Sequence, residues 1–187
     1  MIAAVVLAGG ESRRMGRPKL LLEHGGKTLL AGAVERADRV ADRVIAVVGA
    51  YGDLYRPEAE WAGATVVDNP EWSEGLASSL RVGVSSLGET TEAALVILPD
   101  QPFVTAGHLE ALIARYRETA VPLVFSRYHS TLGAPALIAR PLFPNVLELR
   151  GDRGAKALAG GSELYAEVTL PDGRDVDTPT DLDWLDT

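Results

Sequence analysis

Residues 2–22 read IAAVVLAGGESRRMGRPKLLL, and this stretch decides the fold of the chain. An aliphatic and β-branched run that stops at paired glycines is typical of a buried strand that ends in a loop. Adjacent glycines let backbone N–H groups turn towards a ligand at close range. The first loop, residues 9–19, also carries four cationic side chains: Arg13, Arg14, Arg17 and Lys19. The pattern indicates an anion site, with a surface turn of solvated basic residues as the alternative.

The composition limits what such a site would bind. The chain has 187 residues, a formal net charge of −8 and no cysteine. Because nucleic acids and anionic lipids select broad basic surfaces, we expect neither a nucleic-acid nor a membrane partner. The lack of cysteine excludes thiolate chemistry and cysteine-ligated metals. No apolar run approaches the roughly 18 residues of a membrane span, so we expect a cytoplasmic protein with one domain.

Strands and helices are expected to alternate along the chain. Buried strands are predicted at residues 2–7, 44–48, 65–67, 93–98 and 122–125, and helices at residues 28–38, 57–61, 76–87 and 109–116. Later elements are strands at residues 134–138 and 164–168, a short helix at 155–158, and a last helix that opens at residues 177–181, with Thr178 as its cap. This order predicts an α/β sandwich whose mainly parallel sheet is covered on both faces.

Ligands of open parallel sheets bind beyond the carboxyl ends of the strands, so the residues that follow strands are the candidates. The first loop does not match the P-loop, because five residues separate Gly10 from Gly16 and Arg17 follows where lysine is required. The loop also lacks the Gly-x-Gly-x-x-Gly fingerprint of dinucleotide binding, which argues against a nicotinamide-dependent oxidoreductase.

A second candidate segment, residues 68–75, leads into a predicted helix. Gly75 permits close backbone approach, and Ser78 and Ser79 in the first helical turn could bond a base or a sugar. The alternative is a structural role in which Ser73 caps the helix.

Two carboxylates are candidates for a metal site. Asp100 leaves a buried strand between two prolines, and Asp177 precedes the last helix. If they face each other they could hold one Mg²⁺, which binds through one or two carboxylates plus phosphate oxygens; the alternatives are a turn cap and an acidic, solvated tail. No spacing supports a histidine metal site: His24 and His108 are expected on surface turns, and a solvated role is expected for His129 as well.

Taken together, these motifs resemble a known family. The first loop is similar to the signature of the MobA-like NTP transferase family, and it is also close to the guanylyltransferase version of that signature. The later blocks resemble the molybdenum cofactor cytidylyltransferase branch: Asn69-Pro70-x-Trp72-x-x-Gly75-x-x-x-Ser79-Leu80-x-x-Gly83, Leu98-Pro99-Asp100-Gln101-Pro102, Gly133-x-Pro135, Gly151-Asp152-x-Gly154-Ala155 and Asp177-Thr178-Pro179-x-Asp181-Leu182. The matches span almost the whole chain in order.

The resemblance implies a Rossmann-like three-layer α/β/α sandwich of the nucleotide-diphospho-sugar transferase type, with a single nucleotidyltransferase domain over residues 1–187. It implies a Mg²⁺-dependent enzyme that transfers CMP from CTP to the phosphate of a molybdopterin-type cofactor and releases pyrophosphate. The alternatives are GTP as the donor, another small phosphorylated acceptor such as a sugar phosphate, or a non-catalytic nucleotide- or cofactor-binding protein for molybdoenzyme maturation. A molybdoenzyme or its chaperone would then be a partner.

The resemblance also implies residue roles. Arg14 would hold the β and γ phosphates, Lys19 would stabilise charge on the α-phosphoryl group, and Asp100 would complete the catalytic set and share Mg²⁺ with Asp177. The implied nucleotide-binding residues are Leu7, Ala8, Gly9, Gly10, Ser12, Arg14, Lys19, Asn69, Gly75, Ser79 and Asp100. The implied acceptor-binding residues are Gly133, Pro135, Asp152 and Gly154.

Overall fold

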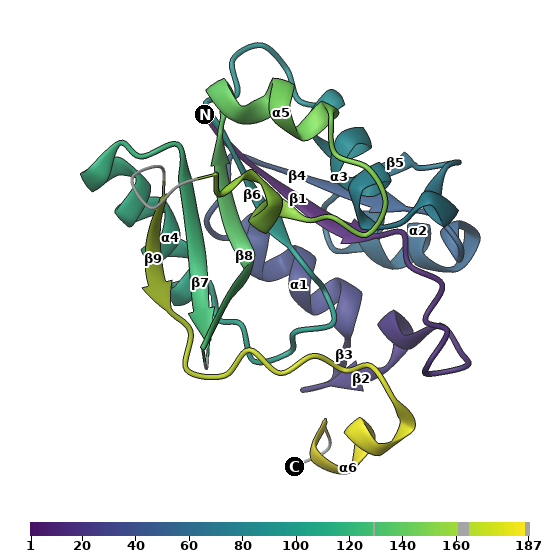
Figure 1. Ribbon diagram of the computed structural model, residues 1–187. Coiled ribbons are helices and arrows are strands. Elements are labelled where there is room, and N and C mark those ends of the chain that lie inside the picture. Colours follow the sequence, from purple (N-terminus) through teal and green to yellow (C-terminus); the bar gives the residue numbers. More distant parts are fainter. Residues whose placement is uncertain (129, 161–164, 186–187) are drawn as a thin grey trace.

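The chain folds around a mixed sheet with helices on both faces (Figure 1). The computed structural model describes residues 1–128, 130–160 and 165–185. The strands are β1 (Ile2–Ala8), β2 (Glu23–His24), β3 (Lys27–Thr28), β4 (Arg43–Val48), β5 (Thr65–Asp68), β6 (Ala93–Ile97), β7 (Leu123–Tyr128), β8 (Thr131–Ala139) and β9 (Tyr165–Thr169). The α-helices are α1 (Leu29–Asp38), α2 (Gly52–Trp61), α3 (Leu76–Ser85), α4 (Ala106–Thr119), α5 (Phe143–Leu147) and α6 (Leu182–Leu185). The 3₁₀ turns are η1 (Lys19–Leu21), η2 (Trp72–Glu74), η3 (Arg140–Leu142), η4 (Ala155–Leu158) and η6 (Pro179–Asp181).

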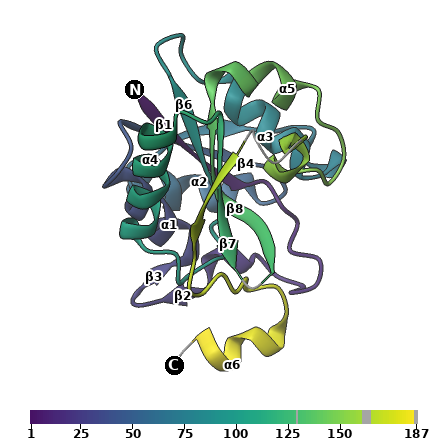
Figure 2. The ribbon, with the colours of Figure 1, turned by 60° about the vertical axis from the view of Figure 1, so that its left-hand side comes forward.

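The seven-stranded sheet has the order β5-β4-β1-β6-β8-β7-β9, and β2 and β3 form a separate hairpin. The interior strand β1 pairs in parallel with β4 and β6, so that Ala4 lies opposite both Val44 and Leu95. Side chains from alternate positions of β1 enter two cores: Ala4 packs with α1, α2 and α4, and Val5 packs with α3 and α5. Figure 2 shows these helices on the two faces of the sheet. The predicted three-layer α/β/α fold is confirmed.

The structure corrects several predicted boundaries. Helix α2 begins at Gly52 rather than at residue 57, because Tyr55 and Ala59, which are four residues apart, both face the core. Strand β8, predicted as residues 134–138, is longer and pairs antiparallel with both β6 and β7. Helix α5 was not predicted. The predicted strand at 164–168 is described from Tyr165 onwards, since residue 164 lies outside the described residues.

The predicted surface turn at His108 is wrong. This residue lies in α4 and is 7% exposed, with its Nε2 atom 2.7 Å from Ser126 Oγ. Burial lowers the pKa of its imidazole. His24 is half-buried in the β2–β3 hairpin, with Nδ1 2.7 Å from the carbonyl oxygen of Leu185, and His129 lies outside the described residues.

The end of the chain returns to the edge of the sheet where β1 and β6 terminate. Val176 is fully buried and donates its N–H to the carbonyl oxygen of Asp100, at 2.9 Å. It shares a small core with Met15, Leu29 and Leu185. In Figures 1 and 2 this final segment passes along the same edge as the first loop. Within the described residues, no helix is both long enough and apolar enough to cross a bilayer.

Candidate active site

A cleft of about 490 Å³ lies at the carboxyl ends of the central strands. Its walls come from the first loop, from η2 and the start of α3, from the end of β6, and from two later carboxylates. It brings together most of the predicted site residues: Leu7, Gly9, Gly10, Ser12, Arg14, Lys19, Gly75, Ser79, Asp100, Asp152 and Asp177. Ala8, Asn69, Gly133, Pro135 and Gly154 do not line it.

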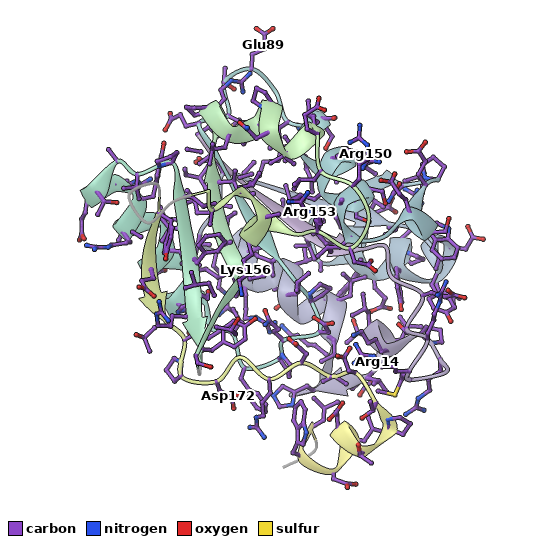
Figure 3. The ribbon with its side chains drawn as sticks, in the orientation of Figure 1. Arg14, Glu89, Arg150, Arg153, Lys156 and Asp172 are labelled. Atoms are coloured by element: carbon purple, nitrogen blue, oxygen red, sulfur yellow. The ribbon has the colours of Figure 1, made fainter. Side chains whose placement is uncertain are left out.

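A lysine joins two carboxylates in this cleft. The ammonium of Lys19 donates to Asp100 Oδ2 at 2.6 Å and to Asp177 Oδ1 at 2.8 Å. The second oxygen of Asp177 lies 2.9 Å from Arg14 Nη2, and Figure 3 shows Arg14 beside the final segment of the chain. The Lys19 side chain is only 13% exposed. Burial alone would lower the pKa of Lys19, but the two carboxylates outweigh that effect and raise it, so the ammonium stays charged.

Local structure holds the two carboxylates in place. Asp100 lies three residues beyond the end of β6, and the Val176 hydrogen bond fixes its backbone to the final segment. The N–H groups of Asp177 and Thr178 both donate to Asp181 Oδ2, at 2.8 and 2.7 Å. Together with the Thr178 hydroxyl, these bonds form a capping box at the start of η6, and Thr178 is the cap that the sequence predicts.

The donor set suits a divalent cation that is shared with a ligand. Asp100 Oδ1 is buried and has no hydrogen-bond partner among the described residues, so it is free to coordinate an ion. Among residues 1–128, 130–160 and 165–185, no group of three or more His, Cys, Asp or Glu side chains could hold a metal. A cation at Asp100 and Asp177 would therefore take its remaining ligands from water and from phosphate oxygens, as Mg²⁺ usually does.

Two glycines allow the walls of the cleft to approach each other. A Cβ atom at Gly9 would lie 2.4 Å from Ser79 Oγ, so a side chain there would force the Ser79 hydroxyl to move. Gly75 has a φ of +117°, and a Cβ atom at this position would lie 2.5 Å from Asp152 Oδ1. Gly75 requires glycine, because its φ is positive and its Cβ atom would also lie 2.7 Å from the backbone carbonyl carbon of Gly151.

Asn69 lies behind the wall rather than on it. It is 1% exposed, and its amide nitrogen donates to Ser78 Oγ at 2.8 Å and to Ser79 Oγ at 3.0 Å. The Ser78 hydroxyl in turn donates to the carbonyl oxygen of Gly75 at 2.8 Å. Of the two serines, only Ser79 lines the cleft, and Asn69 orients it.

The predicted acceptor residues are spread over two regions. Asp152 is on the cleft wall, and Gly154 precedes η4 next to Leu76. Gly133 and Pro135 belong to β8: a Cβ atom at Gly133 would lie 2.4 Å from the Tyr128 hydroxyl, and the Pro135 carbonyl oxygen accepts a bond from Ser126. Gly133 and Pro135 do not line the cleft, although β8 contacts η4, which follows Gly154: Lys156 Nζ donates to Thr131 Oγ1 at 3.2 Å.

Comparison with known proteins identifies the family. Residues 4–167 match the model of the MobA-like NTP transferase domain. The chain belongs to this family. The resemblance seen in the motifs is therefore confirmed over most of the length of the sequence.

Relatives of this MobA-like chain have more than one named activity. It is 27% identical to the molybdenum cofactor cytidylyltransferase of Escherichia coli (strain K12), over 97% of this chain and 93% of the relative. It is 29% identical to the molybdenum cofactor guanylyltransferase of Rhodobacter capsulatus, over 97% of this chain and 93% of the relative. It is 28% identical to the nicotine blue oxidoreductase of Paenarthrobacter nicotinovorans, over 99% of this chain and 93% of the relative. Among solved structures, Rv0371c from Mycobacterium tuberculosis H37Rv is similar with a TM-score of 0.83 and 29% identity, over 97% of this chain and 96% of that chain. A structure of Rv0371c in complex with manganese has a TM-score of 0.80 and 27% identity, over 98% and 97%.

The ion pair between Glu74 and Arg81, at the cleft of this MobA-like chain, was not predicted from the sequence. Glu74 lies on the wall, and its carboxylate accepts from Arg81 Nη1 at 2.8 Å. Hydrogen bonds from Arg81 are the main cause that lowers the pKa of Glu74 to about 2. The two residues lie seven positions apart in the sequence, on either side of Gly75. Only Arg81 belongs to α3, so the spacing of residues along a helix could not predict the pair.

Proposed function

We propose that this chain transfers CMP from CTP to the phosphate of a molybdopterin-type cofactor, with release of pyrophosphate. The observation that carries the proposal is the cluster of Lys19, Asp100 and Asp177 beside a glycine-rich loop that also presents Arg14. The named activities of the E. coli and R. capsulatus relatives support nucleotidyl transfer in molybdenum cofactor maturation.

The reaction requires that the two substrates be positioned and that the negative charge of their phosphates be neutralised. An oxygen of the acceptor phosphate attacks the α-phosphorus of CTP, and the bond from the α-phosphorus to the bridging oxygen of pyrophosphate breaks. Lys19 stabilises the charge that develops on the α-phosphoryl oxygens, and Arg14 holds the β and γ phosphates. Asp100 and Asp177 would hold Mg²⁺, which supplies positive charge to the phosphate oxygens. The structure of the M. tuberculosis relative in complex with manganese supports the use of a divalent cation.

The remaining site residues would divide between donor and acceptor. The nucleotide would lie against Leu7, the backbone at Ala8, Gly9 and Gly10, and the side chains of Ser12 and Ser79, with Gly75 closing one wall; Asn69 would act through Ser79. Asp152 would face the acceptor. Gly133, Pro135 and Gly154 would contact only an acceptor that extends beyond the cleft.

The experiment is incubation of the protein with molybdopterin, Mg²⁺ and each of the four ribonucleoside triphosphates, with release of pyrophosphate as the readout. CTP should give the fastest release. Lys19→Ala and Asp100→Ala should abolish turnover, whereas Lys27→Ala, which removes only an exposed pair with Glu35, should not. Tight nucleotide binding without pyrophosphate release from any triphosphate would show that the chain is a nucleotide-binding protein and does not catalyse the transfer.

Guanylyl transfer is the second candidate. The R. capsulatus guanylyltransferase is as similar to this chain as the cytidylyltransferase is, and the paired Gly9 and Gly10 are close to the guanylyl version of the loop. Faster pyrophosphate release with GTP than with CTP would select this candidate.

A further inference from the structure

One part of the cleft wall is built from two segments that lie far apart in the sequence. Residues 72–75 precede α3, and residues 149–152, here called the 149–152 turn, follow α5. A Cβ atom at Gly75 would lie 2.7 Å from the carbonyl carbon of Gly151, so the two backbones are in contact. The N–H of Ala77 also donates to the carbonyl oxygen of Gly151, at 2.9 Å. In Figure 3 the label of Arg150 marks this turn.

A single guanidinium ties the two segments together. Nη1 of Arg81 donates to Glu74 Oε1 at 2.8 Å and to the carbonyl oxygen of Leu149 at 2.7 Å. Nη2 donates to the other oxygen of Glu74 and lies 3.5 Å from Glu71 Oε2. The Arg81 side chain is 15% exposed. The planar fork of arginine can hold both carboxylate oxygens and a carbonyl oxygen at once, which a lysine cannot do.

The same contact changes the charge of the wall. Glu74 lines the cleft, and an unpaired carboxylate there would repel a triphosphate. Because the pKa of Glu74 is lowered to about 2, the residue is ionised at neutral pH, and the main group that offsets its charge is the Arg81 guanidinium, which holds both of its oxygens; the Gly151 N–H and the charge of Arg150 contribute less.

We propose that Arg81 is a positioning residue of the nucleotide cleft. It docks the 149–152 turn, which carries Asp152, onto the segment at Gly75, and it cancels the charge of Glu74. The affinity of the cleft for a triphosphate therefore depends on a residue that does not line it. The identity of the ligand as a nucleoside triphosphate rests on the proposed function, whereas the docking of the 149–152 turn by Arg81 does not.

The test uses Arg81→Gln, Arg81→Lys as a milder variant, and Arg115→Gln as the matched control. Arg115 makes an exposed surface pair with Glu118 on α4. Hydrogen exchange of the Ala77 amide reports the docking directly, because its acceptor is in the 149–152 turn. We expect exchange about tenfold faster in Arg81→Gln, in keeping with the loss of charged hydrogen bonds, an intermediate rate in Arg81→Lys and no change in the control. Unchanged exchange at Ala77 in Arg81→Gln would overturn the docking.

Binding of CTP in the presence of Mg²⁺ is the second readout. The Kd for CTP of Arg81→Gln should rise about tenfold, and kcat, measured with both CTP and the acceptor at saturation, should fall less than the affinity does. Adding Glu74→Gln to Arg81→Gln should recover part of the affinity, since the freed carboxylate is removed. A Kd equal to that of the control would refute the effect on the nucleotide. If the wild-type protein bound no triphosphate, the proposed function would fail, and the Ala77 exchange rate would still decide whether Arg81 docks the turn.

Discussion

Replacing Lys19 with methionine tests the central cluster without any substrate. Methionine keeps the aliphatic stem and removes two charged hydrogen bonds, to Asp100 at 2.6 Å and to Asp177 at 2.8 Å. A hydrogen bond to a charged group contributes about 1.5–3 kcal/mol to stability. Since Arg14 remains to pair with Asp177, we expect the free energy of unfolding to fall by about 2–4 kcal/mol at neutral pH. In a chain of this size that loss lowers Tm by roughly 5–15 °C.

The pH dependence of this difference has a defined sign. The pKa of Lys19 is raised in the folded protein, so its stabilising effect is complete below the ordinary lysine value of about 10.4. It is lost only as the pH rises through the higher native value. Calorimetry of the variant and the wild type between neutral and alkaline pH measures this difference. Lys27→Met is the control: Lys27 pairs with Glu35 at the surface with 43% of its side chain exposed, and it should change stability by less than about 1 kcal/mol. Equal melting temperatures for the two variants would show that Lys19 does not hold the carboxylates together.

Three further substitutions test single contacts. Gly75→Ala should destabilise the protein by about 1–3 kcal/mol, measured by urea unfolding, because its φ is +117° and its Cβ would lie 2.5 Å from Asp152 Oδ1; a neutral effect would contradict this contact. Glu74→Gln should lose less stability than the wild type as the pH falls from about 5 towards 2. The Glu74 carboxyl has a native pKa of about 2 and an unfolded pKa of about 4.3, so it stabilises the fold fully above the unfolded value. It loses that effect as it is protonated at lower pH. Glu89→Gln, at the solvent-exposed tip in Figure 3, should follow the wild-type acid curve and is the control. Asp177→Asn should reduce pyrophosphate release at least 100-fold if the carboxylate helps to hold the metal, and a rate within a few-fold of the wild type would remove it from that role.

The sequence predicted the parts of this fold that depend on local pattern. The apolar run before Gly9 has the length and composition of a strand buried on both faces, and β1 lies in the interior of the sheet, between β4 and β6. Because the carboxyl ends of parallel strands meet at one edge, the first loop and Asp100 were expected to lie together, and they do. The cap at Thr178, next to Asp177, is also visible in the sequence, whereas the approach of Asp177 to Asp100 depends on the long-range Val176 hydrogen bond.

The features that the sequence did not predict depend on long-range packing. Hydrophobic periodicity indicates a strand in β8 but not its direction, so the antiparallel pairing to β6 could not be inferred. His108 was placed on a turn because isolated histidines are usually solvated, whereas the neighbouring β7 supplies Ser126 as a buried partner. The contact from Arg81 to Leu149 crosses 68 positions of the sequence. No local rule relates such residues.

The bond from Lys19 to both aspartates also affects the order in which ligands bind. In the proposed mechanism, the ammonium of Lys19 competes with the divalent cation for the carboxylates of Asp100 and Asp177. The triphosphate offers Lys19 alternative oxygens and so frees Asp100 and Asp177. Metal and nucleotide should therefore bind with positive cooperativity, and by thermodynamic linkage each should tighten the binding of the other by the same factor.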